Sequence, residues 1–301
     1  MPRFDHNLNF DESNLEDYEF EEAEARTEAY KETAKGKIEG LLDEYRIVWP
    51  TLVEVILEKE HYPWISRGAL LKMYDEGSIR IFRHVGRPSR QEKTLPSFYY
   101  DSSLRKSDVE EKYDEARSLW LKLYKPQDYG LPDYARWAED IVLKMFLDNG
   151  GRLIKRPIPK LNGSSGGDND FLISYGGLHY SVEVKNIFRT LEVESDIRFK
   201  FGVARSNDHE FLFVPRFLNS RHAYTEVIAK GGYVLMFKWM AFPPGAEDFV
   251  SDLEGWGLPV SVWDTLPKSV WSRFDNEIHP KAAEKRISRI SKRVSKTSLD
   301  V

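Results

Sequence analysis

Two acidic side chains and a lysine lie at the ends of two adjoining apolar runs in the middle of the chain. Asp170 stands at the head of the run FLISY, and Glu183 and Lys185 stand near the end of the next run, LHYSVEVKN. Strand side chains point to alternate faces, so Glu183 and Lys185 share one face. A Gly-Gly turn separates the two runs and is expected to pair them as neighbouring strands, which brings the three charges together.

Converging carboxylates can hold Mg²⁺ through their oxygens, and the metal lowers the pKa of a bound water. The ammonium group of a neighbouring lysine can orient or deprotonate that water and neutralise a phosphate. The plain alternative is the solvated face of a half-buried strand, where a Glu and a Lys two residues apart are common. The surrounding elements have to decide between these interpretations.

The elements around the three charges predict an α/β domain with a mixed sheet flanked by helices. Helices are expected over 133–148, around 195–205 and over 219–231. Strands are expected at RLIKRPIP, DFLISY, LHYSVEVKN, EFLFVPRF and YVLMFKW, with a flexible KLNGSSGG turn after the first.

This order resembles the PD-(D/E)XK nuclease superfamily, which has the restriction-endonuclease-like fold, over about residues 133–240. The resemblance implies a Mg²⁺-dependent endonuclease that hydrolyses phosphodiester bonds in DNA, with Mn²⁺ as a substitute metal. It implies that Glu139, Asp170 and Glu183 bind the metal, and that Lys185 completes the catalytic set by acting on the water. Glu139 is matched through its helix, where Asp140 is adjacent.

Two departures from the pattern bear on this assignment. Asn169 stands where the family name has Pro, and Asp168 is close enough in sequence to share the metal. Arg198 and Lys200, on the following helix, are expected to be simple surface bases.

Residues 50–100 have the order helix, turn, helix and two-stranded hairpin, which resembles a winged helix. The second helix is expected to begin at a cap-like Ser66 and to stop at Gly77. The bases expected to contact phosphate are Arg67 and Lys72 on this helix and Arg83, Arg87, Arg90 and Lys93 on the hairpin. The alternative is a module that only packs against its neighbours or pairs two copies as a homodimer.

The two ends of the chain carry opposite charge. Nine acids and one base lie within residues 1–25, whereas seven bases and one acid lie between His279 and Lys296. The basic tail is either a phosphate-binding arm or an intramolecular partner of the acidic end. The expected organisation is an acidic helical segment 1–49, a winged-helix-like module with a linking helix 50–127, a nuclease-like domain 128–275 and a basic tail 276–301.

The amino-acid composition narrows the range of possible functions and locations. The chain has 301 residues, 41% of them hydrophobic, which is enough for a substantial core, and its formal net charge of -5 argues against a uniformly basic coat. The absence of Cys excludes disulfides and thiolate ligands, and with no long apolar stretch it indicates a cytoplasmic protein that is not in a membrane. A catalytically inactive DNA-binding or transcription-related protein built on the nuclease fold, and an RNA-directed nuclease, remain as alternatives.

Overall fold

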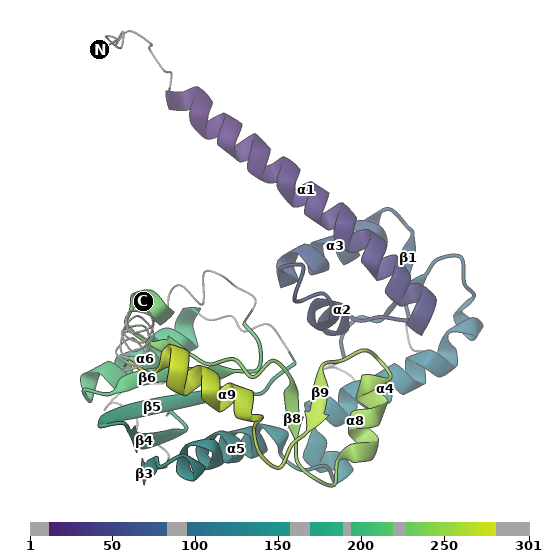
Figure 1. Cartoon of the computed structure of the whole chain (residues 1–301). Helices are drawn as coiled ribbons and strands as arrows, with labels where there is room; N and C mark the ends of the chain where they lie inside the picture. The colour runs from purple at the N-terminus through teal and green to yellow at the C-terminus, as the bar shows by residue number, and fades with distance from the viewer. Residues whose placement is uncertain (1–11, 83–94, 157–168, 189–193, 219–226, 281–301) are drawn as a thin grey trace, which may run out of the picture. The chain divides into compact units, whose positions relative to one another are not determined.

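The computed structural model describes residues 12–82, 95–156, 169–188, 194–218 and 227–280, and the chain forms two compact units, 1–116 and 117–301 (Figure 1). The dividing point falls inside the helix α4, which spans Glu110–Tyr124. No described helix is both long enough and apolar enough to cross a membrane.

In its described residues, unit 1 has three α-helices, then a small antiparallel sheet, a short helix and the start of α4. The elements, in chain order, are α1 (Glu12–Tyr45), α2 (Pro50–Ile56), α3 (Pro63–Asp75), β1 (Ile79–Ile81), β2 (Tyr99–Asp101) and the short helix η2 (Lys106–Asp108). Val48 forms an antiparallel bridge with Tyr99, so an extended segment between α1 and α2 borders β2. This is the element order expected from the sequence for residues 50–100.

The core of unit 1 joins α1 to α3. Ala34 and Ile38 of α1 are 0% exposed, and Leu70 and Met73 of α3 are 1% exposed. These positions recur at helical spacing, so each helix buries one stripe and leaves the opposite side to charged residues. The C-terminal part of the acidic first helix therefore belongs to the core of this unit.

The start of α3 differs from the sequence expectation. The helix begins at Pro63, three residues before Ser66, and Ser66 is fully buried within it. Proline suits the first helical position because its φ angle is already helical and it has no N–H to satisfy there. The end was correctly predicted, since Gly77 follows the C-cap with a φ of 76°.

Unit 2 is built on a five-stranded mixed sheet in the order β3-β4-β5-β6-β7. The strands are β3 (Arg152–Lys155), β4 (Phe171–Tyr175), β5 (Leu178–Lys185), β6 (Glu210–Pro215) and β7 (Tyr233–Val234). The pairs β3–β4 and β4–β5 are antiparallel, whereas β5–β6 and β6–β7 are parallel. The expected turn at Gly176 and Gly177 is present, with φ angles of 60° and 84° that favour glycine.

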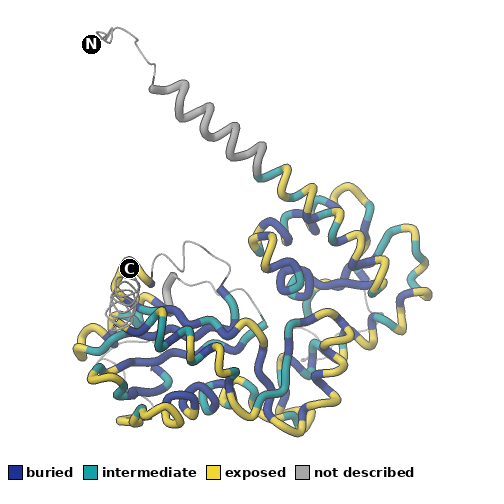
Figure 2. Tube along the Cα trace, in the orientation of Figure 1, coloured by how far each residue is buried: buried dark blue, intermediate teal, exposed yellow. Residues whose placement is uncertain are grey.

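Helices cover both faces of this sheet. Helix α5 (Tyr134–Asp148) packs with the side chains of Tyr180, Val182 and Val184, and helix α6 (Glu194–Ser206) packs with Phe211 and Phe213. The strands β4, β5 and β6 accordingly run through the buried interior of the unit (Figure 2). A mixed sheet flanked by helices was expected from the sequence, and this part of the fold prediction is confirmed.

The remaining elements complete unit 2. They are η3 (Pro126–Tyr129), the parallel pair β8 (Met240–Phe242) and β9 (Val260–Val262), α8 (Glu247–Glu254), α9 (Lys268–Arg273) and η4 (Phe274–Ile278). Phe146 of α5 and Phe274 of η4 are fully buried and meet edge to face, with ring centroids 4.9 Å apart. The C-terminal helices thus close the core on the α5 side.

Candidate functional site

The polar face of β5 lies under helix α6 and away from solvent. Ser181 and Glu183 are both 0% exposed, and they alternate with the apolar residues that face α5. The interpretation of a solvated strand face is therefore wrong for Glu183. A buried carboxylate is costly unless it is paired, so its partners decide what the site can do.

Two lysines contact one oxygen of Glu183. The Nζ atoms of Lys185, at the end of β5, and of Lys200, on α6, both donate to Glu183 Oε1. The other oxygen, Oε2, is buried and has no hydrogen-bond partner among the described residues. An acceptor atom that is buried without a donor marks a place where a cation or a water would be favourable.

Asp170 is held at the edge of β4 beside Glu183. Its backbone N–H donates to the Val182 carbonyl at 3.0 Å, and its Oδ2 accepts the Val184 N–H at 2.7 Å. Because Val182 and Val184 flank Glu183, these two bonds fix Asp170 against the segment that carries Glu183. The predicted convergence of these two acids is thus supported by the strand register.

The electrostatics of Asp170 indicate a crowded acidic site. Burial raises the pKa of the Asp170 carboxyl to about 7, and the negative charges of Glu183 and Glu139 add to the rise. The Val184 N–H and the Lys200 charge oppose it. A carboxyl group with this pKa gives up its proton readily near neutral pH when a cation arrives to replace it.

Glu139 projects from α5 and is held by arginines. Arg156 Nη2 donates to Glu139 Oε2 at 2.7 Å, and Arg156 Nη1 donates to Asp140 Oδ1 at 2.5 Å. The Glu139 side chain is 19% exposed and that of Asp140 is 46% exposed. Glu139 is also the acid of this pair that raises the pKa of Asp170, which supports it over Asp140 as the site residue on this helix.

Lys200 is a site residue that the sequence analysis missed. It was expected to be a surface base, but its side chain is buried against Glu183. The spacing of Ile197, Lys200 and Ala204 could have revealed this, because positions i, i+3 and i+7 share one helix face and the other two are buried. Arg198, the other base of this helix that was singled out from the sequence, is exposed as expected.

Asn169, in the position before Asp170, also belongs to this buried polar group. Its Nδ2 donates to Ser181 Oγ and, at 3.3 Å, to the carbonyl oxygen of Lys200. The residue is 0% exposed, and its Oδ1 has no partner among the described residues. An amide here ties the head of β4 to β5 and α6, a task that proline could not perform.

The number and surroundings of the acids bear on whether they can hold a metal. In the described part of the chain, no group of three or more His, Cys, Asp and Glu side chains is arranged to hold a metal ion. Asp170 and Glu183 nevertheless provide two oxygen donors, one of them an orphaned buried atom. One or two carboxylates suffice for Mg²⁺, which keeps several waters and uses substrate phosphate oxygens as further ligands. The donor atoms of Asp170 and Glu183 are therefore of the kind that fits a Mg²⁺ site.

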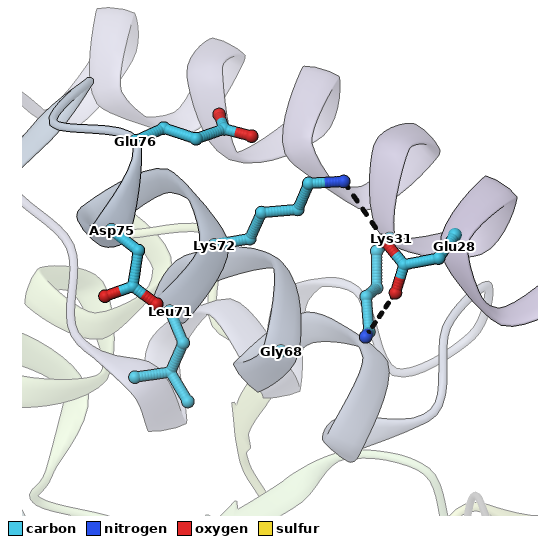
Figure 3. A pocket seen from close by; sticks show the side chains of 7 residues that line it. All are labelled: Glu28, Lys31, Gly68, Leu71, Lys72, Asp75 and Glu76. Carbon is cyan, nitrogen blue, oxygen red and sulfur yellow. Dashed lines mark hydrogen bonds and ion pairs between the residues drawn. The ribbon is translucent and has the colours of Figure 1, made fainter. Parts of the chain in front are cut away.

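The two bases expected on α3 are engaged by acids of unit 1. Arg67 Nη2 lies 2.7 Å from Oε1 of the buried Glu54. Lys72 Nζ lies 3.1 Å from Glu28 and 2.6 Å from Glu32, and its hydrogen bonds to Glu32 and Glu28 raise its pKa. Figure 3 shows Lys72 of α3 and Glu28 of α1 reaching toward each other. Both line a pocket of about 510 Å³. Phosphate would have to compete with these carboxylates for both bases.

Other residues singled out from the sequence lie outside the described residues. They are Arg83, Arg87, Arg90 and Lys93 of the expected hairpin, Asp168, and the bases from Lys281 to Lys296.

Comparison of the chain with protein-family models gives no match, and comparison with curated proteins gives none either.

Proposed function

We propose that this protein is a Mg²⁺-dependent nuclease that hydrolyses phosphodiester bonds in DNA. The observation that carries the proposal is the pair of acids on β4 and β5. Asp170 and Glu183 are held on neighbouring antiparallel strands, repel each other electrostatically, and leave one buried carboxylate oxygen without a partner in the described structure. The resemblance to PD-(D/E)XK nucleases in residue type and element order gives the same assignment.

Asp170 and Glu183 would hold the metal, and Glu139 would assist from α5. A bound Mg²⁺ supplies a Lewis acid for the phosphate and lowers the pKa of a bound water. Asp170 releases its proton to act as a ligand, which its pKa near 7 permits at neutral pH. Lys185, with a side chain that is 24% exposed, can turn from Glu183 toward a phosphate oxygen or the attacking water.

Unit 1 would recruit the nucleic acid as a winged helix. The order α1, bridge segment, α2, α3, β1 and β2 supports this assignment, with Val48 and β1 on either side of β2. The chain between β1 and β2 includes the basic sequence RHVGRPSRQEK, whose charge suits a phosphate backbone. A cytoplasmic location is part of the same proposal, since the chain has no Cys.

A catalytically inactive nucleic-acid-binding protein is the second candidate, and one observation favours it. The charged groups of the site neutralise one another without a metal, because Glu183 pairs with Lys185 and Lys200 and Glu139 pairs with Arg156. A scaffold that had lost its metal would be stable in this arrangement. Activity measurements separate the two candidates.

The test is cleavage of end-labelled linear, branched and single-stranded DNA and RNA by the full-length protein, with Mg²⁺ or with a chelator. We expect Mg²⁺-dependent cutting of at least one DNA, and a loss of about 100-fold or more in Lys185→Met, in line with the loss of a general acid-base group. Lys268→Met, which alters an exposed lysine on α9, is the matched control and should cut normally. Binding to DNA without Mg²⁺-dependent cutting would favour the inactive scaffold, and cutting confined to RNA would reassign the substrate.

A further inference from the structure

The two lysines on Glu183 are held very differently. Both donate to Oε1, but the Lys200 side chain is 6% exposed, whereas that of Lys185 is 24% exposed. Lys185 lies at the last position of β5, where the strand ends. Lys200 lies in the middle of α6, on the face that packs against the sheet.

The backbone around Lys200 is also anchored. Its carbonyl oxygen accepts a hydrogen bond from Asn169, which in turn is bonded to Ser181. Asn169 directly precedes Asp170, and Ser181 lies two residues before Glu183 on the same face of β5. Withdrawing Lys200 from Glu183 would disturb a fully buried polar group, whereas Lys185 can leave by rotation of a partly exposed side chain.

The two oxygens of Glu183 consequently have separate surroundings. Oε1 receives both ammonium groups, and Oε2 is buried without a hydrogen-bond partner among the described residues. Carboxylates that bind metals are themselves held by hydrogen bonds from outer residues, and the loss of such a partner costs about 10- to 100-fold in metal affinity or activity.

We propose that Lys200 is a positioning residue, a fixed counter-ion that holds Glu183 Oε1 and so keeps Oε2 directed at the divalent cation. Lys185 is the lysine that leaves Glu183 and turns to the substrate phosphate. The catalytic use of these two lysines rests on the proposed nuclease function. Their effect on cation binding can be measured without a substrate.

Lys200 has two opposing effects on cation binding. The direction in which the cation affinity changes when Lys200 is removed therefore tells which effect is larger. Its positive charge repels the cation, so a lysine that merely competed with the metal would weaken binding, and its removal would tighten binding. Its hydrogen bond orients the ligand, so a positioning lysine would strengthen binding, and its removal would weaken it. The burial of Lys200 and its anchored backbone favour the second effect.

The experiment measures Mn²⁺ binding to the full-length protein by titration calorimetry. In Lys200→Met we expect an affinity lower by about 10-fold or more, the loss that follows removal of an outer partner of a metal ligand. Lys200→Arg keeps the charge and a donor and should recover most of that affinity. Lys185→Met removes an ammonium group that has to leave Glu183, so it should bind Mn²⁺ at least as tightly as the wild type. Arg205→Met, the control, alters an exposed base in the last turn of α6 and should bind Mn²⁺ as the wild type does.

The variants are first checked for folding by circular dichroism. If Lys200→Met does not fold, Asn169→Ala is the second variant, because it keeps the ammonium but removes the amide that anchors the Lys200 carbonyl, and it should also weaken Mn²⁺ binding. Unchanged or tighter Mn²⁺ binding in the folded Lys200 or Asn169 variant overturns the inference. So does a loss of Mn²⁺ affinity in Lys185→Met that equals the loss in Lys200→Met. A wild type that binds no Mn²⁺ overturns it as well. If the expected pattern of affinities holds but the wild type cuts no nucleic acid, the proposed function fails and the role of Lys200 stands.

Discussion

At the scale of single residues, the site is a balance between buried charges. Glu183 is compensated by two lysines, while Asp170 has a backbone N–H and a position beside two other acids. Asp170 is therefore the group that burial and repulsion affect most. A ligand held ready for a cation in this way lowers the stability of the metal-free protein, because its charged form is disfavoured until the cation arrives.

The first prediction follows from the pKa of Asp170. Burial and repulsion raise this pKa from 3.8 to about 7. Between about pH 4 and pH 7 the folded state therefore keeps a proton that the unfolded state has lost. The contribution of Asp170 to the stability of the metal-free wild type therefore falls as pH rises from about 4 to about 7. Asp170→Asn removes this loss and should raise the free energy of unfolding at pH 8 by on the order of 1–3 kcal/mol.

Urea denaturation at pH 4 and pH 8, in buffer with chelator, checks this difference. The gain should shrink to a small part of its pH 8 value near pH 4, where Asp170 is protonated in the folded wild type and only about half ionised in the unfolded chain. A variant that is less stable than the wild type at pH 8, or a gain that does not depend on pH, would contradict the assigned environment of Asp170.

Sequence reasoning identified Asp170, Glu183 and Lys185 because alternation along a strand and a two-residue turn are local properties. It chose Glu139 over the adjacent Asp140 through the resemblance alone, because the phase of a helix relative to a sheet depends on packing. Lys200 was missed for a related reason. Its contact with Glu183 joins residues 17 apart on different elements, and a lysine is usually exposed.

At the scale of elements, α5 packs on one face of the sheet and carries Glu139, whereas α6 packs on the other face and carries Lys200. The N-terminus of α5 is fixed by Asp133, whose side chain accepts hydrogen bonds from the N–H groups of Ala135 and Arg136. This cap sets the first turn of the helix that carries Glu139. Helix α6 is fixed at its middle by Asn169 and Lys200.

The second prediction concerns this cap. Asp133→Ala should lower the free energy of unfolding by about 1 kcal/mol, the usual loss when an N-cap side chain is removed. Asp148→Ala is the matched control at the other end of α5, where it removes an exposed ion pair with Lys144, and it should cost only about 0.3–0.5 kcal/mol. Urea denaturation measures both, and equal losses would show that the cap does not stabilise the helix.

Most elements of unit 2 could be predicted because their apolar patterns are long and their glycines mark the turns. The start of α3 was wrong because a serine that resembles a cap competed with a proline that begins the helix. The burial of both faces of β5 was not predictable from alternation alone. A polar face covered by a helix has the same sequence pattern as a polar face in water.

At the scale of the whole molecule, the chain has a formal net charge of -5 but a strongly basic end, so its contacts with a polyanion must be local. Lys72 of unit 1 is neutralised within the unit by Glu28 and Glu32. The other basic stretches of the sequence are the segment RHVGRPSRQEK between β1 and β2 and the residues after 280. The charge of these segments could be predicted from the sequence. The ion pairs of Lys72 could not, because they depend on how α1 packs on α3.

The third prediction concerns the tail. Removal of residues 281–301 should weaken binding to duplex DNA and flatten its salt dependence, by about 0.9 log unit of slope for each phosphate group that the tail neutralises in the full-length protein. The measurement is the DNA dissociation constant of the full-length and truncated proteins over a series of salt concentrations. An unchanged slope would assign the tail to an intramolecular role.

We propose above that Asp170 and Glu183 form a metal site for phosphodiester hydrolysis. Single-turnover cleavage of end-labelled DNA by Asp170→Asn in Mg²⁺ is the sharpest test of that site. This variant is expected to be more stable than the wild type, so loss of folding could not explain a loss of activity. Glu254→Gln, which alters an exposed acid on α8, is the control and should cut at the wild-type rate. We expect Mg²⁺-dependent cutting by the wild type and the control, and a rate at least about 100-fold lower in Asp170→Asn, as when a catalytic metal loses a ligand. Cutting by Asp170→Asn at the wild-type rate, or the same rate in the wild type with and without Mg²⁺, would contradict it.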